Sequence, residues 1–393
     1  MKILYSFPHP ADRLGTQRAG HVIRASALLN ALEALGNEVI RIEAASEKST
    51  KISVNLYRNM VRNLLPRPIA VRVRDYGRIR HGKRYADHLI EAVRQYMPDL
   101  ILETHIAFSL AGKIASERTG LPLILDDCSP AWEEEQQYGV GLRNEAIQIH
   151  REVTSHASLV VAVNETMRKY LIDGGLFPET VITIENGIDN SIFNLGVNGN
   201  LYRKYYKFPN DAVVIVFVGS FQPYHRVELL LEAFHLIYKE QAKAYLMLIG
   251  AGRTLAGSKA LTEKLELSDR VIFTDQVSYS EVPSYIAAGD IAVMPATNSY
   301  GNPMKIYEYM AMGKAVIAPD QPTIREITTH GRDSHLFEAE NVSSLAQALT
   351  TLIIDKELRT RLGLQGNRLA TEHTWNKRAV ILQNAFAKVC KSP

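Results

Sequence analysis

The strongest constraint on the fold is an alternation of short apolar runs with longer amphipathic stretches, which continues along most of the chain. The apolar runs predict strands over Lys2–Ser6, Glu38–Ile42, Leu100–Leu102, Leu121–Leu125, Leu159–Val163, Val181–Ile184, Val213–Val218, Tyr245–Ile249, Val271–Thr274, Ile291–Met294 and Ala315–Ala318. Predicted helices between them include Gly20–Leu35, Tyr85–Tyr96, Ser109–Arg118, Asn144–Ala157 and Val227–Tyr238. This alternation is typical of parallel sheets covered by helices on both faces. The sequence therefore predicts an α/β fold with doubly wound parallel sheets.

Length and one polar segment predict two such domains. The chain has 393 residues, which suits two domains of roughly 150 to 200 residues each. Residues 186–200 contain Asn-Gly and further Asn and Gly without periodicity, so this segment is the candidate linker. We expect one domain over residues 1–190, a second over 191–376, and a helix in 377–393 that packs back on the first. Two such domains facing each other would leave a crevice between the carboxyl ends of their sheets.

The segment Ile291 to Pro319 combines two buried strands with a Gly-Asn-Pro loop and a short helix, which together form a βαβ unit. Backbone NH groups after Gly301 should face the carboxyl edge of the sheet, where anions bind. Lys305 and Glu308 are three residues apart and share one helix face. A nucleoside diphosphate fits this pair, with Lys305 at the phosphate and Glu308 at the ribose. The alternative is an exposed ion pair worth about 0.3 to 0.5 kcal/mol.

Charge and cysteine content exclude several classes of function. The chain has 45 Lys and Arg against 42 Asp and Glu, a net charge of +3, and gives no general reason to expect nucleic acid. Cys128 and Cys390 are the only cysteines and lie far apart, which disfavours a disulfide framework or a thiolate metal site. There is no signal-like segment and no apolar run of membrane-spanning length. We therefore expect a cytoplasmic protein, with the inner face of a membrane as a second option.

A basic stretch lies between Lys51 and Arg84, where ten Lys or Arg residues meet one acid, Asp75. Val54, Tyr57, Val61 and Leu64 recur at helical spacing with Arg58 and Arg62 between them, which predicts a basic amphipathic helix that Pro66 ends. Residues 51–84 could contact an anionic membrane or an acidic, lipid-phosphate acceptor. The alternative is a helix packed on its own domain with its arginines in water.

Several motifs together resemble one enzyme family. They are Gly15 and Gly20 after the first strand, Glu185-Asn-Gly-Ile-Asp189 with Phe193, Phe217-Val-Gly219, Gly289-Asp-Ile-Ala-Val-Met-Pro295 and Lys305-Ile-Tyr-Glu-Tyr-Met-Ala-Met-Gly313. With these motifs the chain resembles the retaining GT-B glycosyltransferases of the family 4 type. The resemblance implies two Rossmann-like domains that face each other across a cleft. It also implies a nucleotide sugar bound mainly by the C-terminal domain and an acceptor bound by the N-terminal one.

The family's site residues carry over position by position, with two departures. Donor binding is implied for Gly15, Gly219, Ser220, His225, Arg226, Val277, Gly301, Asn302, Pro303, Met304, Lys305 and Glu308. Glu308 falls on the second Glu of the family's Glu-x7-Glu motif, while Tyr300 replaces the first. The Arg and Lys that usually follow the glycine at 219 are replaced by Ser220-Phe-Gln-Pro-Tyr-His-Arg226. Arg226 or a protonated His225 could substitute for them; the alternative for His225 is to cap the following helix.

On the N-terminal side, His105 and the pair Asp126 and Asp127 follow predicted strands. His105, Lys305 and Arg226 are the predicted catalytic residues, with His105 orienting a sugar or acceptor hydroxyl; a packed or capping histidine is the alternative. Asp126 and Asp127 are predicted to bind the acceptor. The acids Glu133 to Glu135 could also bind it, although a solvated helix start explains them as well.

The resemblance implies transfer with retention from a nucleotide-diphosphate sugar to a glycan, lipid-linked or small-molecule hydroxyl. The chain has no Asp-x-Asp motif, so cationic side chains should replace a metal at the diphosphate, and no cofactor is expected beyond the co-substrate. Two alternatives stay open. A nucleotide-sugar epimerase of the same fold is disfavoured by Asn186-Gly-Ile-Asp189, and a catalytically silent relative is suggested by Tyr300 and the missing cations.

Overall fold

The computed structural model describes residues 1–9, 12–15, 20–44, 66–130 and 139–390. The chain divides into two compact units, one formed by residues 1–185 and 378–393 and the other by residues 186–377. The final helix α16 (Trp375–Val389) thus joins mainly the first unit, where Arg378 pairs with Glu185 at 2.6 Å. The predicted amphipathic helix over residues 54–64 and the acids Glu133 to Glu135 lie outside the described residues.

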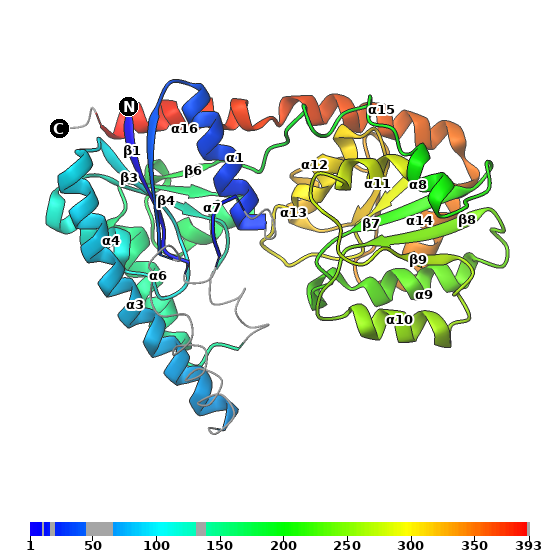
Figure 1. The fold of residues 1–393 in the computed structure, drawn as a ribbon, viewed down its shortest axis with the longest axis horizontal. Helices are drawn as coiled ribbons and strands as arrows, with labels where there is room; N and C mark the ends of the chain where they lie inside the picture. The colour runs from blue at the N-terminus through cyan, green and yellow to red at the C-terminus, as the bar shows by residue number, and fades with distance from the viewer. Residues whose placement is uncertain (10–11, 16–19, 45–65, 131–138, 391–393) are drawn as a thin grey trace. The chain divides into compact units, whose positions relative to one another are not determined.

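The first unit is built on a six-stranded parallel sheet with the order β2-β1-β3-β4-β5-β6 (Figure 1). Its strands are β1 (Lys2–Phe7), β2 (Glu38–Glu43), β3 (Leu100–Thr104), β4 (Leu123–Asp127), β5 (Leu159–Ala162) and β6 (Val181–Thr183). Its helices are α1 (Gly20–Ala34), α3 (Arg67–Tyr96), α4 (Ala111–Thr119), α6 (Arg143–His156), α7 (Glu165–Asp173) and the short η3 (Pro178–Thr180).

The second unit repeats this plan with the strand order β12-β11-β10-β7-β8-β9. Its strands are β7 (Val213–Val218), β8 (Ala244–Ile249), β9 (Val271–Phe273), β10 (Ile291–Val293), β11 (Ala315–Pro319) and β12 (His335–Phe337). Its helices are α8 (Asn200–Tyr205), η4 (Pro223–His225), α9 (Val227–Ile237), α10 (Leu255–Lys264), α11 (Val282–Ala288), α12 (Met304–Ala311), α13 (Pro322–Arg325), α14 (Val342–Ile354) and α15 (Lys356–Glu372). Two parallel sheets with flanking helices confirm the predicted α/β class.

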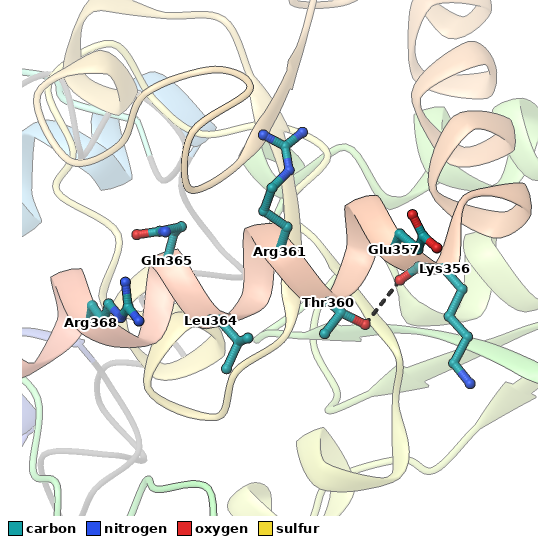
Figure 2. A pocket seen from close by; sticks show the side chains of 7 residues that line it. All are labelled: Lys356, Glu357, Thr360, Arg361, Leu364, Gln365 and Arg368. Atoms are coloured by element: carbon teal, nitrogen blue, oxygen red, sulfur yellow. Dashed lines mark hydrogen bonds between the residues drawn. The ribbon is translucent and has the colours of Figure 1, made fainter.

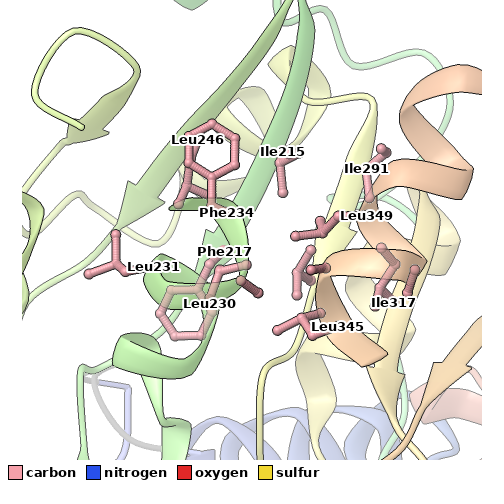
Figure 3. Close-up of a cluster of buried hydrophobic side chains, with 14 of the residues drawn as sticks. Ile215, Phe217, Leu230, Leu231, Phe234, Leu246, Ile291, Ile317, Leu345 and Leu349 are labelled. Carbon is pink, nitrogen blue, oxygen red and sulfur yellow. The ribbon is translucent and has the colours of Figure 1, made fainter. Parts of the chain in front are cut away.

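Side-chain alternation explains why the strands of the second sheet are apolar throughout. Ile215, Phe217, Ile291 and Ile317 point to one face, where they pack with α9 and α14 (Figure 3). Val214, Val216, Ala292 and Val316 point to the opposite face and pack with α11 and α12. Because both faces are covered, a strand in the middle of the sheet has no solvent side on which a polar residue would be stable. Packing on both faces of the sheet thus fixes the positions of the strands, and with them the positions of the loops at the strand ends.

Strand β4 lies two residues later than predicted, so Asp126 and Asp127 form its end and do not follow it. Two larger differences concern β12 and α3. The edge strand β12 was not predicted, because its three residues His-Leu-Phe are too few to show a period. The helix predicted over Tyr85–Tyr96 begins 18 residues earlier, at Arg67. Its first half has many charges and a Gly and buries few apolar residues, so its sequence gives a weak helical signal, yet Pro66 occupies its N-cap and the helix continues without a break. Residues 67–84, which lie before the predicted start of the helix, are therefore also helical.

Candidate active site

The carboxyl edge of the second sheet brings two loops together at the point where the strand order reverses. From β7 the chain moves to β8 and β9 on one side, and it then returns to β10 on the other side of β7. The pairing of Ile291 with Ile215 places the loop after β10 beside the loop after β7. Open α/β sheets bind ligands at such a switch point. Gly219 to Arg226 and Gly301 to Lys305 both follow these strands.

Lys305 lies in the first turn of α12 and directs its ammonium toward the β7 loop. Its Nζ lies 4.8 Å from the centre of the Phe217 ring, and a Cβ added to Gly219 would come within 3.1 Å of it. The Nζ atom is buried and has no hydrogen-bond partner among the described residues. Burial lowers the pKa of Lys305 to about 7, against the opposing effect of Glu308. A buried ammonium without a partner is costly, which marks this point as the place where an anion would be most stabilising.

Glu308 follows Lys305 by one helical turn and is also buried, with 7% of its surface exposed. Burial raises the pKa of Glu308 to about 7, although Lys305 and Tyr279 act in the other direction. The Tyr279 hydroxyl donates to Glu308 Oε1 at 3.4 Å. Burial and the Glu308 carboxylate raise the pKa of Tyr279, so its hydroxyl stays protonated and available as a donor. The exposed ion pair considered as the alternative is thus excluded, because both charged groups are buried.

Tyr279 was missed in the sequence analysis, although it lies two residues after the predicted donor-binding Val277. Val277 itself packs at the rim of the core, in the same cluster as Tyr279. The Tyr279 ring also meets Phe193 edge-on at 5.8 Å between centroids. The only signal in the sequence was an aromatic residue after strand Val271–Phe273, which is too common a feature to assign a role.

Close backbone packing at this edge requires glycine at several positions. A Cβ on Gly250, whose φ is +120°, would lie 2.0 Å from the Gly219 carbonyl oxygen. A Cβ on Gly252 would lie 1.7 Å from the Ser220 carbonyl oxygen. The loop after β8 therefore supports the β7 loop directly. The supporting role of Gly250 and Gly252 depends on contacts between loops that are distant in the sequence.

His225 and Arg226 do not supply a free cation. His225 is buried in η4 and accepts a hydrogen bond from the Gln222 NH on Nδ1 at 3.4 Å. Burial, with a smaller effect from Lys305, holds the pKa of His225 well below its ordinary value, which disfavours the protonated form that was suggested to replace the family's cation. His225 caps η4 rather than helix α9.

The Arg226 guanidinium pairs with Glu228 at 2.5 Å and also with Glu340. Its backbone has a φ of +47° at the N-cap of α9. Contact with a phosphate would require Arg226 to exchange these carboxylates for the ligand. Among the predicted catalytic cations, Lys305 alone is buried and without a partner in the described part of the chain.

The loop before α12 is held by Asn302, whose side chain is engaged within the protein. Asn302 Oδ1 accepts from the Asn186 NH at 3.1 Å, and its Nδ2 donates to the Tyr307 hydroxyl at 3.2 Å. The Asn302 side chain thus fixes the loop, and its part in donor binding stays a prediction. Pro303 is the N-cap of α12, and no described side chain caps this helix. The amides of Met304 and Lys305 open α12 beside Gly301.

The predicted residues of the first unit form a separate group at the ends of β3 and β4. Asp126 is buried and pairs with Arg24, with 2.9 Å between Arg24 Nη2 and Asp126 Oδ1. Asp127 Oδ2 lies 2.7 Å from His150 Nε2. His105 lies beside this pair, with 5.0 Å between its ring centre and that of His150. Because Arg24 occupies the Asp126 carboxylate, the predicted acceptor contact of Asp126 is disfavoured.

His105 and Asp127 keep unsatisfied atoms. Both ring nitrogens of His105 and Oδ1 of Asp127 are buried and have no hydrogen-bond partner in the part of the chain that the structure describes. Burial lowers the pKa of His105 to about 4, while Asp127 acts in the opposite direction, so the imidazole is neutral near pH 7. A neutral imidazole offers one donor and one acceptor, which complements a hydroxyl group. His150 was missed because nothing in helix α6 distinguishes it from the other histidines in the sequence.

Gly15 lies in the loop after β1 with a φ of +80°, and its NH donates to Ser26 Oγ at 3.2 Å. This left-handed conformation favours glycine. Ser220 is exposed, and Tyr300 is half-buried next to Gly301. Tyr300 supplies no carboxylate in place of the family's first Glu.

Two groups of side chains have the composition of a metal site in the described part of the chain, namely His105, Asp127 and His150, and His9, Asp12 and His21. In the first group the short bond between Asp127 and His150 would have to open, and His105 lacks the second acceptor that usually orients a metal-bound imidazole. In the second group His9 Nδ1 already accepts from the Asp12 NH at 2.8 Å. We assign a metal to neither group.

A shallow hollow along α15 is unrelated to this chemistry. It is lined by Lys356, Glu357, Thr360, Arg361, Leu364, Gln365 and Arg368 (Figure 2). The side chains stand on one exposed helix, and Thr360 Oγ1 only bonds back to the Lys356 carbonyl at 2.9 Å. None of the lining residues is a buried titratable group, so we assign this hollow no role.

Comparison with known proteins agrees with the fold and the motifs. Residues 200–368 match the family described as glycosyl transferases group 1, and residues 19–191 match glycosyltransferase family 4. A D-inositol 3-phosphate glycosyltransferase of Thermomonospora curvata is 26% identical over 296 residues, which are 70% of this chain and 68% of that protein. The fold resembles a sucrose-phosphate synthase from Thermosynechococcus elongatus, with a TM-score of 0.78, 17% identity and 99% of each chain covered. The Anabaena protein HepE in complex with UDP and glucose gives a TM-score of 0.72 at 17% identity, with 100% of each chain covered.

The two Rossmann-like units and these matches define an enzyme of the GT-B glycosyltransferase class. The chain belongs to the group 1 glycosyltransferases of the family 4 type, and the resemblance predicted from its motifs is confirmed. No helix in the described part of the chain is long and apolar enough to cross a bilayer.

Proposed function

We propose that this glycosyltransferase transfers a sugar, with retention and without a metal at the diphosphate, from a nucleotide-diphosphate sugar to an acceptor hydroxyl. The observation that carries the proposal is the buried Lys305 ammonium, which has no hydrogen-bond partner in the described residues and lies next to Gly219 and one turn before Glu308. This arrangement matches a diphosphate followed by a ribose. The Anabaena HepE complex with UDP and glucose, a structure of the same fold, supports a nucleotide sugar as the donor.

In this proposal Lys305 and the first amides of α12 stabilise the negative charge of the departing nucleoside diphosphate. A charge-assisted hydrogen bond contributes about 1.5 to 3 kcal/mol. A helix N-terminus adds about 0.3 to 1 kcal/mol. The low dielectric around the buried ammonium strengthens both effects in the transition state. Diphosphate binding would restore the charged form of Lys305, because a neighbouring anion favours the ammonium.

Glu308 would accept hydrogen bonds from the ribose hydroxyls, with Tyr279 holding one carboxylate oxygen. Two hydroxyl donors would replace water that the buried carboxylate has lost and would favour its ionised form. Because Tyr300 stands where the family has a first Glu, contacts to the donor sugar must differ from those of relatives that keep the acid. The sugar is therefore left unassigned.

On the other unit, the neutral His105 and the free oxygen of Asp127 would orient a sugar or acceptor hydroxyl. The imidazole donates or accepts one hydrogen bond, while Asp127 Oδ1 accepts a second one from a hydroxyl. With retention, the acceptor attacks from the side of the leaving group and the departing phosphate helps to take its proton. No carboxylate nucleophile is needed for that route. A glycan, a lipid-linked sugar or a small polyol would each offer a suitable hydroxyl.

The decisive experiment is calorimetric titration of the wild type with UDP, UMP and uridine, and with the corresponding guanosine and adenosine compounds, followed by donor hydrolysis assays. We expect one base series to bind, with the diphosphate bound most tightly, and Glu308→Gln to weaken every member of that series. Asp275→Asn serves as the matched control, because Asp275 is an exposed acid of the same unit that pairs with Lys259. Unchanged affinity in Glu308→Gln would remove the ribose assignment.

A further inference from the structure

The first half of α3 exposes three large apolar side chains on one face. Ile69, Val73 and Tyr76 are 47%, 51% and 68% exposed. Their spacing of four and then three residues places them in one line along the helix. This part of α3 extends beyond the sheet of its own unit (Figure 1). A single exposed apolar residue is ordinary, but an unbroken strip of three marks an interaction surface.

The strip is surrounded by cations. Arg80 continues the same line, and the remaining exposed cations of this half are Arg67, Arg72, Lys83 and Arg84. In the described part of the chain none of these five forms an ion pair. The one acid between Arg67 and Arg84 is Asp75, which is fully buried and accepts from the Gly141 NH at 2.6 Å. The outward face therefore combines apolar side chains with uncompensated positive charge.

The opposite face of the helix keeps this strip turned outward. A Cβ on Gly82 would touch the backbone of Ser109 and Leu110 at 3.4 Å, so α3 packs closely on the start of α4. The Arg78 guanidinium lies 5.5 Å from the centre of the Phe108 ring. Asp75 joins the helix to the segment before α6, as described above. The strip is thus preformed by packing and does not depend on folding upon contact.

We propose that Ile69, Val73 and Tyr76, together with the exposed cations around them, dock on an anionic lipid bilayer surface. An apolar strip flanked by Lys and Arg is the composition of a helix that lies in the membrane interface, with its apolar side chains at the acyl boundary. The cations would then meet lipid phosphates, which complement them in charge. The apolar strip alone would also suit a protein partner. The positive charge around it favours an anionic bilayer, because lipid phosphates complement that charge. This inference does not depend on the sugar donor or on turnover.

The test is flotation of the full chain with vesicles of phosphatidylcholine alone or mixed with phosphatidylglycerol. We expect binding to the anionic vesicles only, and a loss at high salt because ions screen the attraction. Ile69→Gln/Val73→Gln/Tyr76→Gln should weaken binding by about tenfold or more through lost apolar burial. Arg72→Gln/Arg80→Gln/Arg84→Gln should weaken it similarly and remove most of the salt dependence.

The matched control is Leu236→Gln/Leu364→Gln, which removes two apolar side chains that are 56% and 52% exposed on α9 and α15. This variant should bind vesicles as the wild type does. In Tyr76→Trp, the added indole should shift its emission to the blue with anionic vesicles. Unchanged circular dichroism and an unchanged urea unfolding midpoint would show that the variants fold. Absence of flotation, insensitivity to both α3 variants, or self-association through the strip in sedimentation velocity would each overturn the proposal.

Discussion

Both units have polar side chains at the carboxyl edge of their sheet, but they differ in whether the buried charges there are paired. Among the described residues, the buried Lys305 ammonium of the second unit has no hydrogen-bond partner, and Glu308 has one long bond, from Tyr279. In the first unit Arg24 neutralises Asp126, Asp127 bonds to His150, and the remaining imidazole of His105 is neutral. The second edge thus has a buried charge without a hydrogen-bond partner in the described residues, whereas the buried charges of the first edge are compensated, as the proposed roles in binding a charged donor and a neutral hydroxyl require.

The largest change in stability is expected at the buried ion pair of the first unit, between Arg24 and Asp126. Arg24→Met leaves the Asp126 carboxylate buried and unpaired, which should destabilise the protein by about 3 to 5 kcal/mol. Arg41→Met is the control, because Arg41 and Glu33 form a half-exposed pair worth at most about 1 kcal/mol. Urea unfolding monitored by circular dichroism measures both. Equal losses of unfolding free energy in the two variants would mean that the buried pair of Arg24 and Asp126 stabilises the protein no more than an exposed pair does.

A smaller effect with the opposite sign on stability should appear at Lys305. Lys305→Met removes a buried ammonium without a partner, so the free protein should be at least as stable as the wild type. Binding of a nucleoside diphosphate should weaken by about 1.5 to 3 kcal/mol, while binding of the nucleoside should change little. Calorimetric titration measures the affinities. Lys259→Met, at an exposed pair with Asp275, is the control and should bind as the wild type does. Equal losses for diphosphate and nucleoside would refute the phosphate role.

The pH dependence of stability should also distinguish the second edge. The pKa of Glu308 is raised to about 7 from its ordinary 4.5, so its contribution to stability is lost as pH rises from about 4.5 to 7. The pKa of Lys305 is lowered to about 7 from 10.5, so its contribution is complete above about 10.5 and is lost as pH falls toward 7.

Together these shifts predict the weakest contribution near pH 7. Urea unfolding as a function of pH should therefore show a flatter fall between pH 5 and 7 in Glu308→Gln than in the wild type. Lys305→Met should show a flatter rise between pH 7 and 9. Identical profiles for the wild type and both variants would mean that these groups are solvated in the free protein.

The smallest effect should come from Tyr279→Phe. The hydroxyl bond to Glu308 is long, so its loss should weaken nucleoside binding by about 0.5 to 1.5 kcal/mol. Tyr205→Phe is the control, because Tyr205 is 72% exposed on α8. Titration with the nucleoside that binds the wild type gives the comparison. A loss above that of Glu308→Gln would show that Tyr279 acts by more than its contact with the carboxylate.

Most of the fold could be predicted from the sequence, because strands covered on both faces are apolar throughout and stand out against amphipathic helices. The βαβ unit around Lys305 was predicted, with its loop, helix and second strand. The length of α3 was not, because its first half keeps a solvent-facing side and gives a weak periodic signal. Edge strand β12 was too short to show a period at all.

Prediction of the site was less complete, and the reason is spatial. Lys305 and Glu308 lie close together in the sequence and share a helix face, so the pair could be found from spacing alone. Tyr279 and His150 contact their partners across 29 and 23 positions of the chain, so local patterns do not connect them. Arg226 was predicted to face a phosphate, but the carboxylate of Glu340 comes from a distant segment and engages it.

Periodicity and motif spacing are properties of neighbouring residues, so the amino-acid sequence was enough to predict the class of fold, the family and the βαβ unit that carries the lysine and the glutamate. Tertiary structure alone decided which charges are compensated and which have no partner. Burial removes water from an ionisable group. Only the positions of the surrounding residues show whether a hydrogen bond or an opposite charge replaces that water. The neutral His105, the engaged Asp126 and the ammonium of Lys305 all follow from that arrangement.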